Sequence, residues 1–166
     1  MGQKLTKGDV EKIQAEIDQR RIELRPQLTS AVAEAAAQGD RSENFEYYAA
    51  KQDNNRNNSR IRYLQNVLRY GEVIEEAPEG EVGVDTQVTV YIPDDDEEEN
   101  YLLVTPIRTN SLNNIVSIDS PLGRALMHHH VGDTVLIRVN DQFSYECEIR
   151  GVSHSDEAAA LGISEF

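Results

Sequence analysis

The side chains best placed to do chemistry are two acids three positions apart, Asp40 and Glu43, in the segment GDRSEN at positions 39–44. Helical patterns lie on both sides of this segment, so the two carboxylates lie at a bend. Two carboxylates in one turn can converge on a divalent cation, and Mg²⁺ usually takes one or two carboxylates together with waters and phosphates. Alone in water they make a poor site. The spacing therefore predicts half of a metal site, which another active site holding a metal and a phosphodiester would complete.

The same spacing has a structural alternative. An Asp-x-x-Glu pair can form a capping box, in which Asp40 accepts a hydrogen bond from the Glu43 amide while Glu43 reaches back to Asp40. Ser42 can cap the same turn, so a helix would not need Asp40 for that purpose. The spacing alone leaves both interpretations open, a chemically active bend and a capped helix.

The chain before the bend has the pattern of one long helix. Thr6 can act as its N-cap with Asp9 at the capping-box position, and Gly39 suits its C-terminal end. Pro26 falls inside this helix and is expected to weaken or bend it. Apolar residues recur at intervals of three, four or seven and predict one packed stripe: Val10, Ile13, Ile17, Leu24, Leu28, Ala31 and Ala35.

The chain after the bend predicts a second helix, from about Ser42 to Tyr70. Positions 51–60 are almost wholly polar, and the apolar residues crowd toward the far end, at Ile61, Leu64, Val67 and Leu68. Such a helix does not suit a globular core, but it suits a pair of antiparallel helices that pack mainly on each other. We therefore predict a coiled-coil hairpin over residues 1–76. About 31 residues at roughly 1.5 Å each give an arm of about 45 Å, with the two acids at its end.

Beyond position 78 the hydrophobic period changes to that of strands. Short β-branched segments at 87–92, 101–105, 115–118, 134–139 and 145–150 predict a small antiparallel sheet. One short helix interrupts them, with Ser120 as cap, Pro121 at its first position and Met127 near its end. The fold class predicted is α + β, with a second domain over 79–152 and a polar tail over 153–166.

Charge is unevenly distributed and excludes one function for the second half. Residues 1–75 carry 12 Lys/Arg and 12 Asp/Glu, whereas residues 76–166 carry 4 and 18 and account for the whole net charge of −14. So acidic a surface repels phosphates and is not expected to bind nucleic acid. The single cysteine, Cys147, excludes an internal disulfide. No apolar run is long enough for a membrane span or a signal segment, so we expect a cytoplasmic protein without a membrane partner.

Two blocks of sequence resemble the bacterial Gre transcript-cleavage factors, the GreA/GreB family of transcription elongation factors. The first is GDRSEN followed by Glu46, Tyr47 and Lys51, and the second is IDSPLGRAL at 118–126 followed by VGD at 131–133. The resemblance implies that the second domain is FKBP-like and docks on RNA polymerase beside its secondary channel. It also implies that the helical arm enters the channel, where the acids help the polymerase to cleave backtracked RNA. Such a protein is not itself an enzyme.

The resemblance assigns roles residue by residue. Asp40 and Glu43 match the functional acids and would hold Mg²⁺ jointly with the polymerase, with none bound tightly by the free protein. Asn44 and Tyr47 would support them, against an alternative of helix packing. The partners implied are the polymerase elongation complex and, indirectly, the RNA 3′ end, and the protein is expected to be a monomer. Arginines that could face the RNA or the channel wall, or simply solvent, are Arg20, Arg21, Arg25, Arg56, Arg60 and Arg62; the docking candidates, with a capped and packed helix as the alternative, are Ser120, Pro121 and Arg124.

Several alternatives remain open. A Gre-like protein could occupy the channel without promoting cleavage, and the GreA and GreB subtypes are not separable from the sequence. A prolyl isomerase would need an aromatic pocket, and a chaperone arm would need an apolar tip, so neither fits well. The histidines at 128–130 are expected to be solvated, and the acidic run at 94–99 predicts a solvated hairpin.

Overall fold

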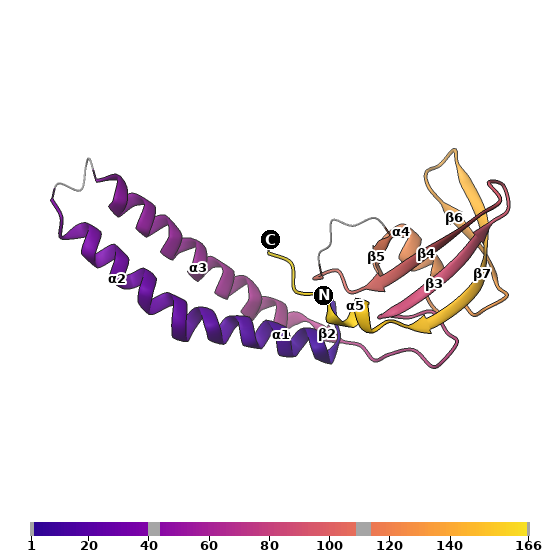
Figure 1. Ribbon diagram of the computed structural model, residues 1–166, viewed down its shortest axis with the longest axis horizontal. Helices are drawn as coiled ribbons and strands as arrows, with labels where there is room; N and C mark the ends of the chain where they lie inside the picture. The colour runs from indigo at the N-terminus through magenta and orange to yellow at the C-terminus, as the bar shows by residue number, and fades with distance from the viewer. Residues whose placement is uncertain (1, 40–43, 109–113, 166) are drawn as a thin grey trace. The chain divides into compact units, whose positions relative to one another are not determined.

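The computed structural model describes residues 2–39, 44–108 and 114–165 (Figure 1). The chain forms two compact units, a helical unit made mainly of Asp9–Gly71 and a sheet unit made of Gln3–Gly8 together with Glu72–Phe166. The boundary predicted from composition was at residues 76–79. The short segment Gln3–Gly8 belongs with the sheet unit because strand β1 (Lys4–Leu5) pairs in parallel with β2 (Glu72–Val73). No helix in the described ranges is both long and apolar enough to cross a membrane.

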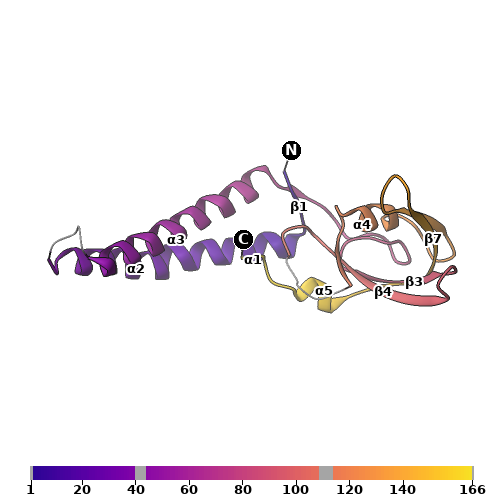
Figure 2. The same ribbon diagram turned by 90° about the horizontal axis from the view of Figure 1, so that it is seen from above.

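The helical unit is a hairpin. Its first half contains α1 (Lys7–Asp18), a π-helical turn (Gln19–Leu24) and α2 (Arg25–Ala36), and its second half is α3 (Phe45–Tyr70). Figures 1 and 2 both show α2 and α3 side by side, running in opposite directions. Three residues of the predicted stripe, Ile13, Ile17 and Ala35, are buried, as are Ile61, Leu64 and Val67 on α3. The other members of the stripe are only partly buried: Val10, Leu24, Leu28 and Ala31.

The disturbance expected at Pro26 takes the form of the π-helical turn that precedes it. Proline has no N–H to donate to the carbonyl of Ile22, and its ring would clash with that carbonyl in a regular α-helix. The backbone widens instead, and the N–H of Arg25 donates to the carbonyl of Arg20, five residues earlier. The helix therefore passes the proline without breaking.

A polar seam joins the two helices beside this widened turn. Asn57 is only 3% exposed. Its Nδ2 donates to the carbonyl oxygen of Arg20 at 3.2 Å, and its Oδ1 accepts from Nη1 of the same arginine at 3.0 Å. Arg25 Nε donates to Asn58 Oδ1 at 3.0 Å in the next turn. A buried asparagine whose bonds are satisfied fixes the register of paired helices, because any slip leaves it unpaired.

The seam continues in an ion-pair cluster around Glu16. Arg20 Nε and Arg60 Nε each lie 2.8 Å from Glu16 Oε2, and Arg60 Nη2 lies 3.2 Å from Oε1. Burial by itself would raise the pKa of Glu16, but the hydrogen bonds and charges of Arg60 and Arg20 outweigh it and hold the pKa below its ordinary value. One carboxylate thus ties both halves of the hairpin together.

The sheet unit has five strands in the order β5-β4-β3-β7-β6. Their ranges are β3 Thr86–Ile92, β4 Glu97–Val104, β5 Ile115–Ser117, β6 Thr134–Arg138 and β7 Ser144–His154. All neighbours are antiparallel except β4 and β5, which are parallel at one edge. The predicted fold class, a helical hairpin followed by a small sheet domain, is confirmed, and the parallel edge makes the sheet mixed.

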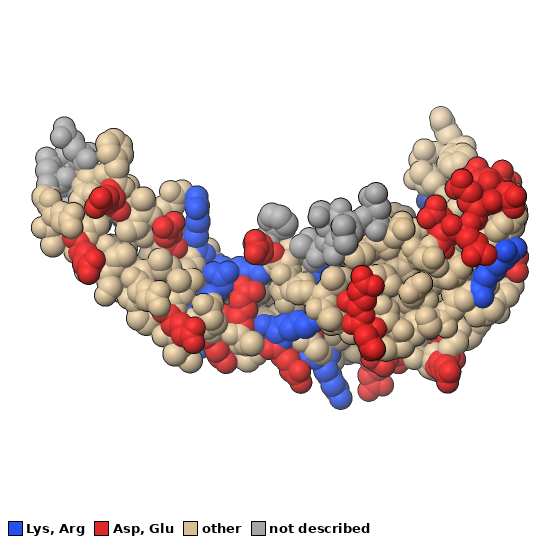
Figure 3. All heavy atoms as spheres, in the orientation of Figure 1, with Lys and Arg blue, Asp and Glu red and all other residues tan. Residues whose placement is uncertain are grey.

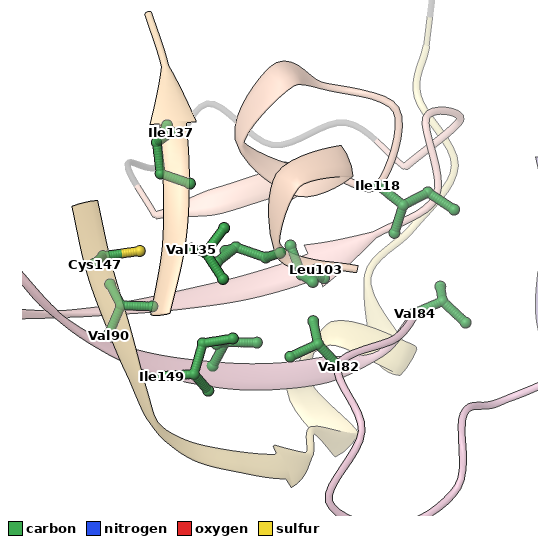
Figure 4. Packing of buried hydrophobic residues seen from close by; sticks show 11 residues of the cluster. Val82, Val84, Val90, Leu103, Ile118, Val135, Ile137, Cys147 and Ile149 are labelled. Carbon is green, nitrogen blue, oxygen red and sulfur yellow. The ribbon is translucent and has the colours of Figure 1, made fainter. Parts of the chain in front are cut away.

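One face of this sheet carries the core. Buried and exposed residues alternate along β6, as they must when side chains point to opposite faces in turn. Figure 4 shows Val90, Val135 and Ile149, from three different strands, pointing toward the same interior. Helix α4 (Pro121–Leu126) adds Leu126 to this cluster, which is otherwise built of Val82, Val84, Val88, Leu103, Ile118, Ile137 and Cys147.

The acidic run forms the turn between β3 and β4, as predicted. Asp94 to Glu98 are exposed, and Glu97 is the first residue of β4. Tyr91 donates its hydroxyl hydrogen to Asp96 Oδ1 at 2.6 Å across the turn. Figure 3 shows the red acidic atoms gathered over this end of the sheet unit.

A buried arginine, Arg108, ties the chain ends to the sheet. It is 4% exposed and donates to Asp85, which is also buried, to Thr6 Oγ1 at 2.8 Å and to the carbonyl oxygen of Ala158 at 3.1 Å. Ala158 lies in α5 (Asp156–Ala160), whose N-cap is Ser155. The segment predicted as a polar tail therefore completes β7 and forms a packed helix, because Arg108 and Ala158 give it a buried anchor.

We expect Arg108→Ala to destabilise the sheet unit by about 3–5 kcal/mol, because it leaves the buried Asp85 carboxylate without its partner. Chemical denaturation, followed by hydrogen exchange in β7 and α5, would measure the loss. The exposed Arg138 on β6 provides the control, and Arg138→Ala should change stability by less than about 0.5 kcal/mol. Equal stability of the two variants would contradict the structural role of Arg108.

Acid should weaken the hairpin through Glu16. Because the pKa of Glu16 in the folded arm lies below its ordinary value of 4.5, its ion pairs stabilise the fold above that pH. This contribution is lost as the pH falls through the folded pKa. The melting temperature of the helical signal should therefore fall by a few degrees more in the wild type than in Glu16→Gln between pH 6 and pH 3. Glu11→Gln, at an exposed site of α1, should retain the wild-type slope.

Candidate functional site

The bend of the hairpin is the candidate site. Asp40 and Glu43 lie outside the described residues, but the residues on both sides of them are described. The first helix ends at Ala36, and the N–H of Ala37 donates to the carbonyl of Ala33 at 3.2 Å. Gly39 has a φ of 132°, which favours glycine. The predicted end of the first helix at Gly39 is therefore explained by its backbone.

Asn44 closes the bend from the other side. It is the N-cap of α3, and its Oδ1 accepts from the N–H of Tyr47 at 3.0 Å. Its Nδ2 donates to the carbonyl oxygen of Ala35 at 2.6 Å, in the last turn of α2. One side chain thus caps the second helix and joins it to the end of the first.

This arrangement bears on the capping alternative for the acids. The helix predicted to start at about Ser42 starts at Phe45, and its cap is Asn44. A described residue therefore performs the task that the alternative interpretation gave to Asp40. The sequence did contain the signal, since Asn is a preferred cap and stands three positions before Tyr47. Asp40 and Ser42 are also preferred caps, so the sequence alone did not identify Asn44 as the one used.

Aromatic residues fill the first turn of α3. Tyr47, one of the predicted support residues, is partly buried, and its ring meets the ring of Tyr48 edge-on at 5.4 Å between centroids. The ammonium of Lys51 lies 6.0 Å from the Tyr47 ring. Phe45 and Tyr48, by contrast, are 86% and 52% exposed.

The predicted RNA-facing arginines divide into two groups. Arg20 and Arg60 belong to the polar seam through Glu16 and Asn57. Arg21 and Arg56 are exposed. Figure 3 shows the blue Lys and Arg atoms of the helical unit interspersed with red acidic atoms. The other two predicted arginines, Arg25 and Arg62, donate to the side chains of Asn58 and Ser59.

The docking candidates lie at the start of α4. Ser120 is its N-cap and accepts from the N–H of Gly123 at 3.0 Å, while its hydroxyl donates to the carbonyl of Ser117 at 2.7 Å. Gly123 must be glycine, because a Cβ there would lie 2.1 Å from the Ser117 oxygen. Ser120 therefore shapes the helix, and Pro121 and Arg124, three positions apart, share its exposed side.

The three adjacent histidines lie near two acids, and His128 and His130 are exposed. His128 Nδ1 and His130 Nε2 lie 3.7 and 3.5 Å from the Glu81 carboxylate, and His129 Nδ1 lies 3.3 Å from Asp133 Oδ2. The backbone N–H of His130 donates to Asp133 and lowers its pKa. Across the described ranges no set of three or more histidine, cysteine or acidic side chains is arranged to hold a metal ion.

Cavities in the sheet unit do not resemble an isomerase site. One, of about 500 Å³, is lined by Thr6, Lys7, Gly8, Ile74, Glu75, Glu76, Asp85 and Ala159. Two others, of about 370 and 320 Å³, lie against the segment 76–81. None of these three has a Phe, Tyr or Trp in its lining, although a prolyl-isomerase pocket would need such aromatic residues.

Comparison with known proteins gives consistent matches over the chain. Residues 3–73 match the family model described as "Transcription elongation factor, N-terminal", and residues 77–154 match "Transcription elongation factor, GreA/GreB, C-term". The transcription elongation factor GreA of Thermosipho africanus is 37% identical over 134 residues, which are 81% of this chain and 86% of that protein. GreA of Oenococcus oeni is 34% identical over 151 residues, which are 90% and 93% of the two chains.

Solved structures give looser matches. GreA factor homolog 1 (Gfh1) of Thermus thermophilus is 26% identical, covers 92% of this chain and 99% of its own, and superposes with a TM-score of 0.44. A GreA/GreB factor of Nitrosomonas europaea is 24% identical and covers 57% and 79% of the two chains, with a TM-score of 0.42. On the evidence of the two family models and the curated relatives, this chain belongs to the GreA/GreB family of transcription elongation factors.

Proposed function

We propose that this protein binds RNA polymerase at its secondary channel and stimulates the cleavage of backtracked nascent RNA, so that arrested elongation complexes restart. Asp40 and Glu43 carry the activity by completing the polymerase's own metal site. The polymerase breaks the phosphodiester bond, so this chain is a cofactor of that reaction and not an enzyme. The observation that supports this most directly is a pair of acids at the bend of a helical hairpin in a chain of the GreA/GreB family.

The hairpin is suited to carry these acids to a distant site. Helix α3 alone has 26 residues, which is about 39 Å at 1.5 Å per residue. The seam formed by Asn57, Arg20, Glu16 and Arg60 resists sliding of one helix along the other. Asn44 joins the two helices at the bend itself. The acids are thereby attached to a stiff support at both ends of their segment.

The donor set fits a shared Mg²⁺ site. Two carboxylates supply at most part of the octahedral oxygen shell that Mg²⁺ requires, so these residues suit an ion that is also held by other ligands and by phosphate. Mg²⁺, when bound there, supplies activation of water and neutralisation of the developing charge. The task of Asp40 and Glu43 is to add negative oxygens to that shell and to orient the attacking water as hydrogen-bond acceptors.

The sheet unit supplies the docking surface in this proposal. Pro121 and Arg124 present an apolar surface and a guanidinium side by side on α4, beyond the cap that Ser120 provides. Residues 76–166 carry 4 Lys/Arg and 18 Asp/Glu, so their field repels RNA and favours a basic protein surface. We therefore assign contact with nucleic acid to the helical unit, where the exposed Arg21 and Arg56 can face the RNA or the channel wall.

A second outcome would assign a different function. A protein that occupied the channel without completing the metal site would bind the polymerase and block it. Cleavage of backtracked RNA in stalled complexes, with and without this protein, separates the two: faster cleavage supports the proposal, and unchanged or slower cleavage supports inhibition.

Asp40→Asn and Glu43→Gln should each reduce stimulated cleavage by at least about tenfold at limiting Mg²⁺, because each removes one anionic oxygen donor from the shared shell. High Mg²⁺ should restore part of the rate. The measurement is the single-turnover cleavage rate of a backtracked complex across a Mg²⁺ series, with polymerase binding measured in parallel.

Asp53→Asn is the matched control for these variants, because Asp53 is an exposed acid farther along α3. This variant should stimulate cleavage and bind the polymerase like the wild type. A parallel loss of binding and cleavage in Asp40→Asn or Glu43→Gln would instead indicate that the acids maintain the fold.

Asn44→Ala should lower stimulated cleavage about tenfold without loss of polymerase binding, because it removes both the cap of α3 and the bond to Ala35. The cap alone is worth about 1 kcal/mol of helix stability. Asn44→Ser separates the two roles, since serine can cap α3 but cannot reach the Ala35 carbonyl with an amide. We expect Asn44→Ser to be nearly as defective as Asn44→Ala in the same assay. If Asn44→Ser stimulated cleavage as well as the wild type does, the link between the helices would be dispensable.

A further inference from the structure

Two large aromatic side chains are left in solvent directly behind the bend. Phe45 is 86% exposed and is the most exposed of the large apolar residues in the described ranges, and Tyr48 is 52% exposed. An isolated exposed apolar residue needs no explanation, but two rings on one helical turn form a patch. We call Phe45 and Tyr48 the aromatic patch.

The geometry of the helix directs this patch toward the bend. Phe45 and Tyr48 are three positions apart, so they lie on the same side of α3. Side chains on an α-helix lean toward its N-terminus, which here is the end at the bend. Tyr47 packs edge-on against Tyr48 at 5.4 Å and supports its ring from the neighbouring face. The two exposed rings are therefore held beside the segment that contains Asp40 and Glu43.

The patch is too small for a protein interface. Two aromatic side chains bury about 150–250 Å² each when fully covered, whereas a stable interface buries about 800 Å² on each partner. The apolar surface does not continue along the helix, because positions 51–60 of α3 are almost wholly polar. A second copy of this chain would therefore gain little area by packing here. An occupant of one or two planar rings matches the size.

Local charge indicates which part of a nucleotide would fit. Asp40 and Glu43 precede the patch in the sequence and Glu46 lies between its two residues, while Arg41 and Lys51 are the only basic residues between positions 39 and 52. This surplus of acids repels phosphate groups, so binding through the RNA backbone is disfavoured here. Stacking on a base does not require that attraction, because every base has a π-face and stacks on an aromatic side chain.

We infer that Phe45 and Tyr48 form a stacking surface for an unpaired nucleobase of the RNA near its displaced 3′ end. This inference rests on the proposed function, which brings the bend to a phosphodiester of that RNA. Stacking would hold the nucleotide next to the scissile bond while the acids act on the metal shell. Phe45 and Tyr48 are then positioning residues that contact the substrate, and their contribution is independent of base identity.

Fluorescence of 2-aminopurine at the RNA 3′ end of a backtracked complex tests the contact directly. The factor would carry Asp40→Asn and Glu43→Gln, so that the RNA stays uncut. We expect this protein to change the fluorescence, and we expect the change to be lost when Phe45→Ala and Tyr48→Ala are added. Tyr70→Ala is the matched control, since Tyr70 is 64% exposed at the other end of the same helix. No fluorescence change on saturation with the factor would overturn the inference.

Cleavage kinetics supply the second test. At saturating factor, Phe45→Ala with Tyr48→Ala should slow cleavage about tenfold on normal RNA, and should have no effect on RNA with abasic nucleotides at the displaced positions. An equal effect on both RNAs would overturn the inference and assign the patch to the polymerase wall. If the wild type gives no stimulation at all, the proposed function fails. The fluorescence result still decides whether the base stacks.

Discussion

The structure depends on one constraint: two largely polar helices must stay in register without a continuous apolar interface. Asn57 meets this constraint at the widened turn, where it binds both the carbonyl and the guanidinium of Arg20. Glu16 meets it one turn away by binding Arg20 and Arg60 together. Each bond is modest, but a shift of register would break them all and leave buried polar groups unpaired. Position along the arm is therefore fixed by polar contacts, while Ile13, Ile17, Ile61 and Leu64 supply the apolar contact at its base.

The arm and the sheet were predictable where one physical effect dominated. The apolar stripe gave the hairpin, and the β-branched segments gave the strands, because periodic burial leaves a periodic pattern. Other features depend on contacts between residues far apart in sequence. The sequence around Arg108 does not indicate that this side chain is buried, yet it donates hydrogen bonds to Thr6, Asp85 and Ala158. The parallel pairing of β4 with β5 likewise depends on a crossover that composition does not specify.

The candidate site shows the same division. The two acids are visible in the sequence by type and spacing, and their role stays a prediction. The part that sequence reasoning missed is their support. Three neighbouring residues could cap the helix, and only the structure identifies Asn44 as the cap and as the link to Ala35. The arginines could not be told apart by sequence either. Arg20 and Arg60 form ion pairs with Glu16 that join the two helices, whereas Arg21 and Arg56 are exposed.

A bend with this composition must solve an electrostatic conflict. Anionic oxygens are needed to complete a cation's shell, but the same charges repel the phosphates of the substrate until the cation is present. Arg41 already stands between the two acids in the sequence, and further arginines there would weaken the acids as metal ligands by pairing with them. Neutral aromatic rings avoid this, since stacking holds a nucleotide without contributing charge. The described part of the helical unit is consistent with this reasoning: the exposed rings of Phe45 and Tyr48 lie in the first turn of α3, and the ion-paired Arg20 and Arg60 lie farther back, where they stiffen the arm.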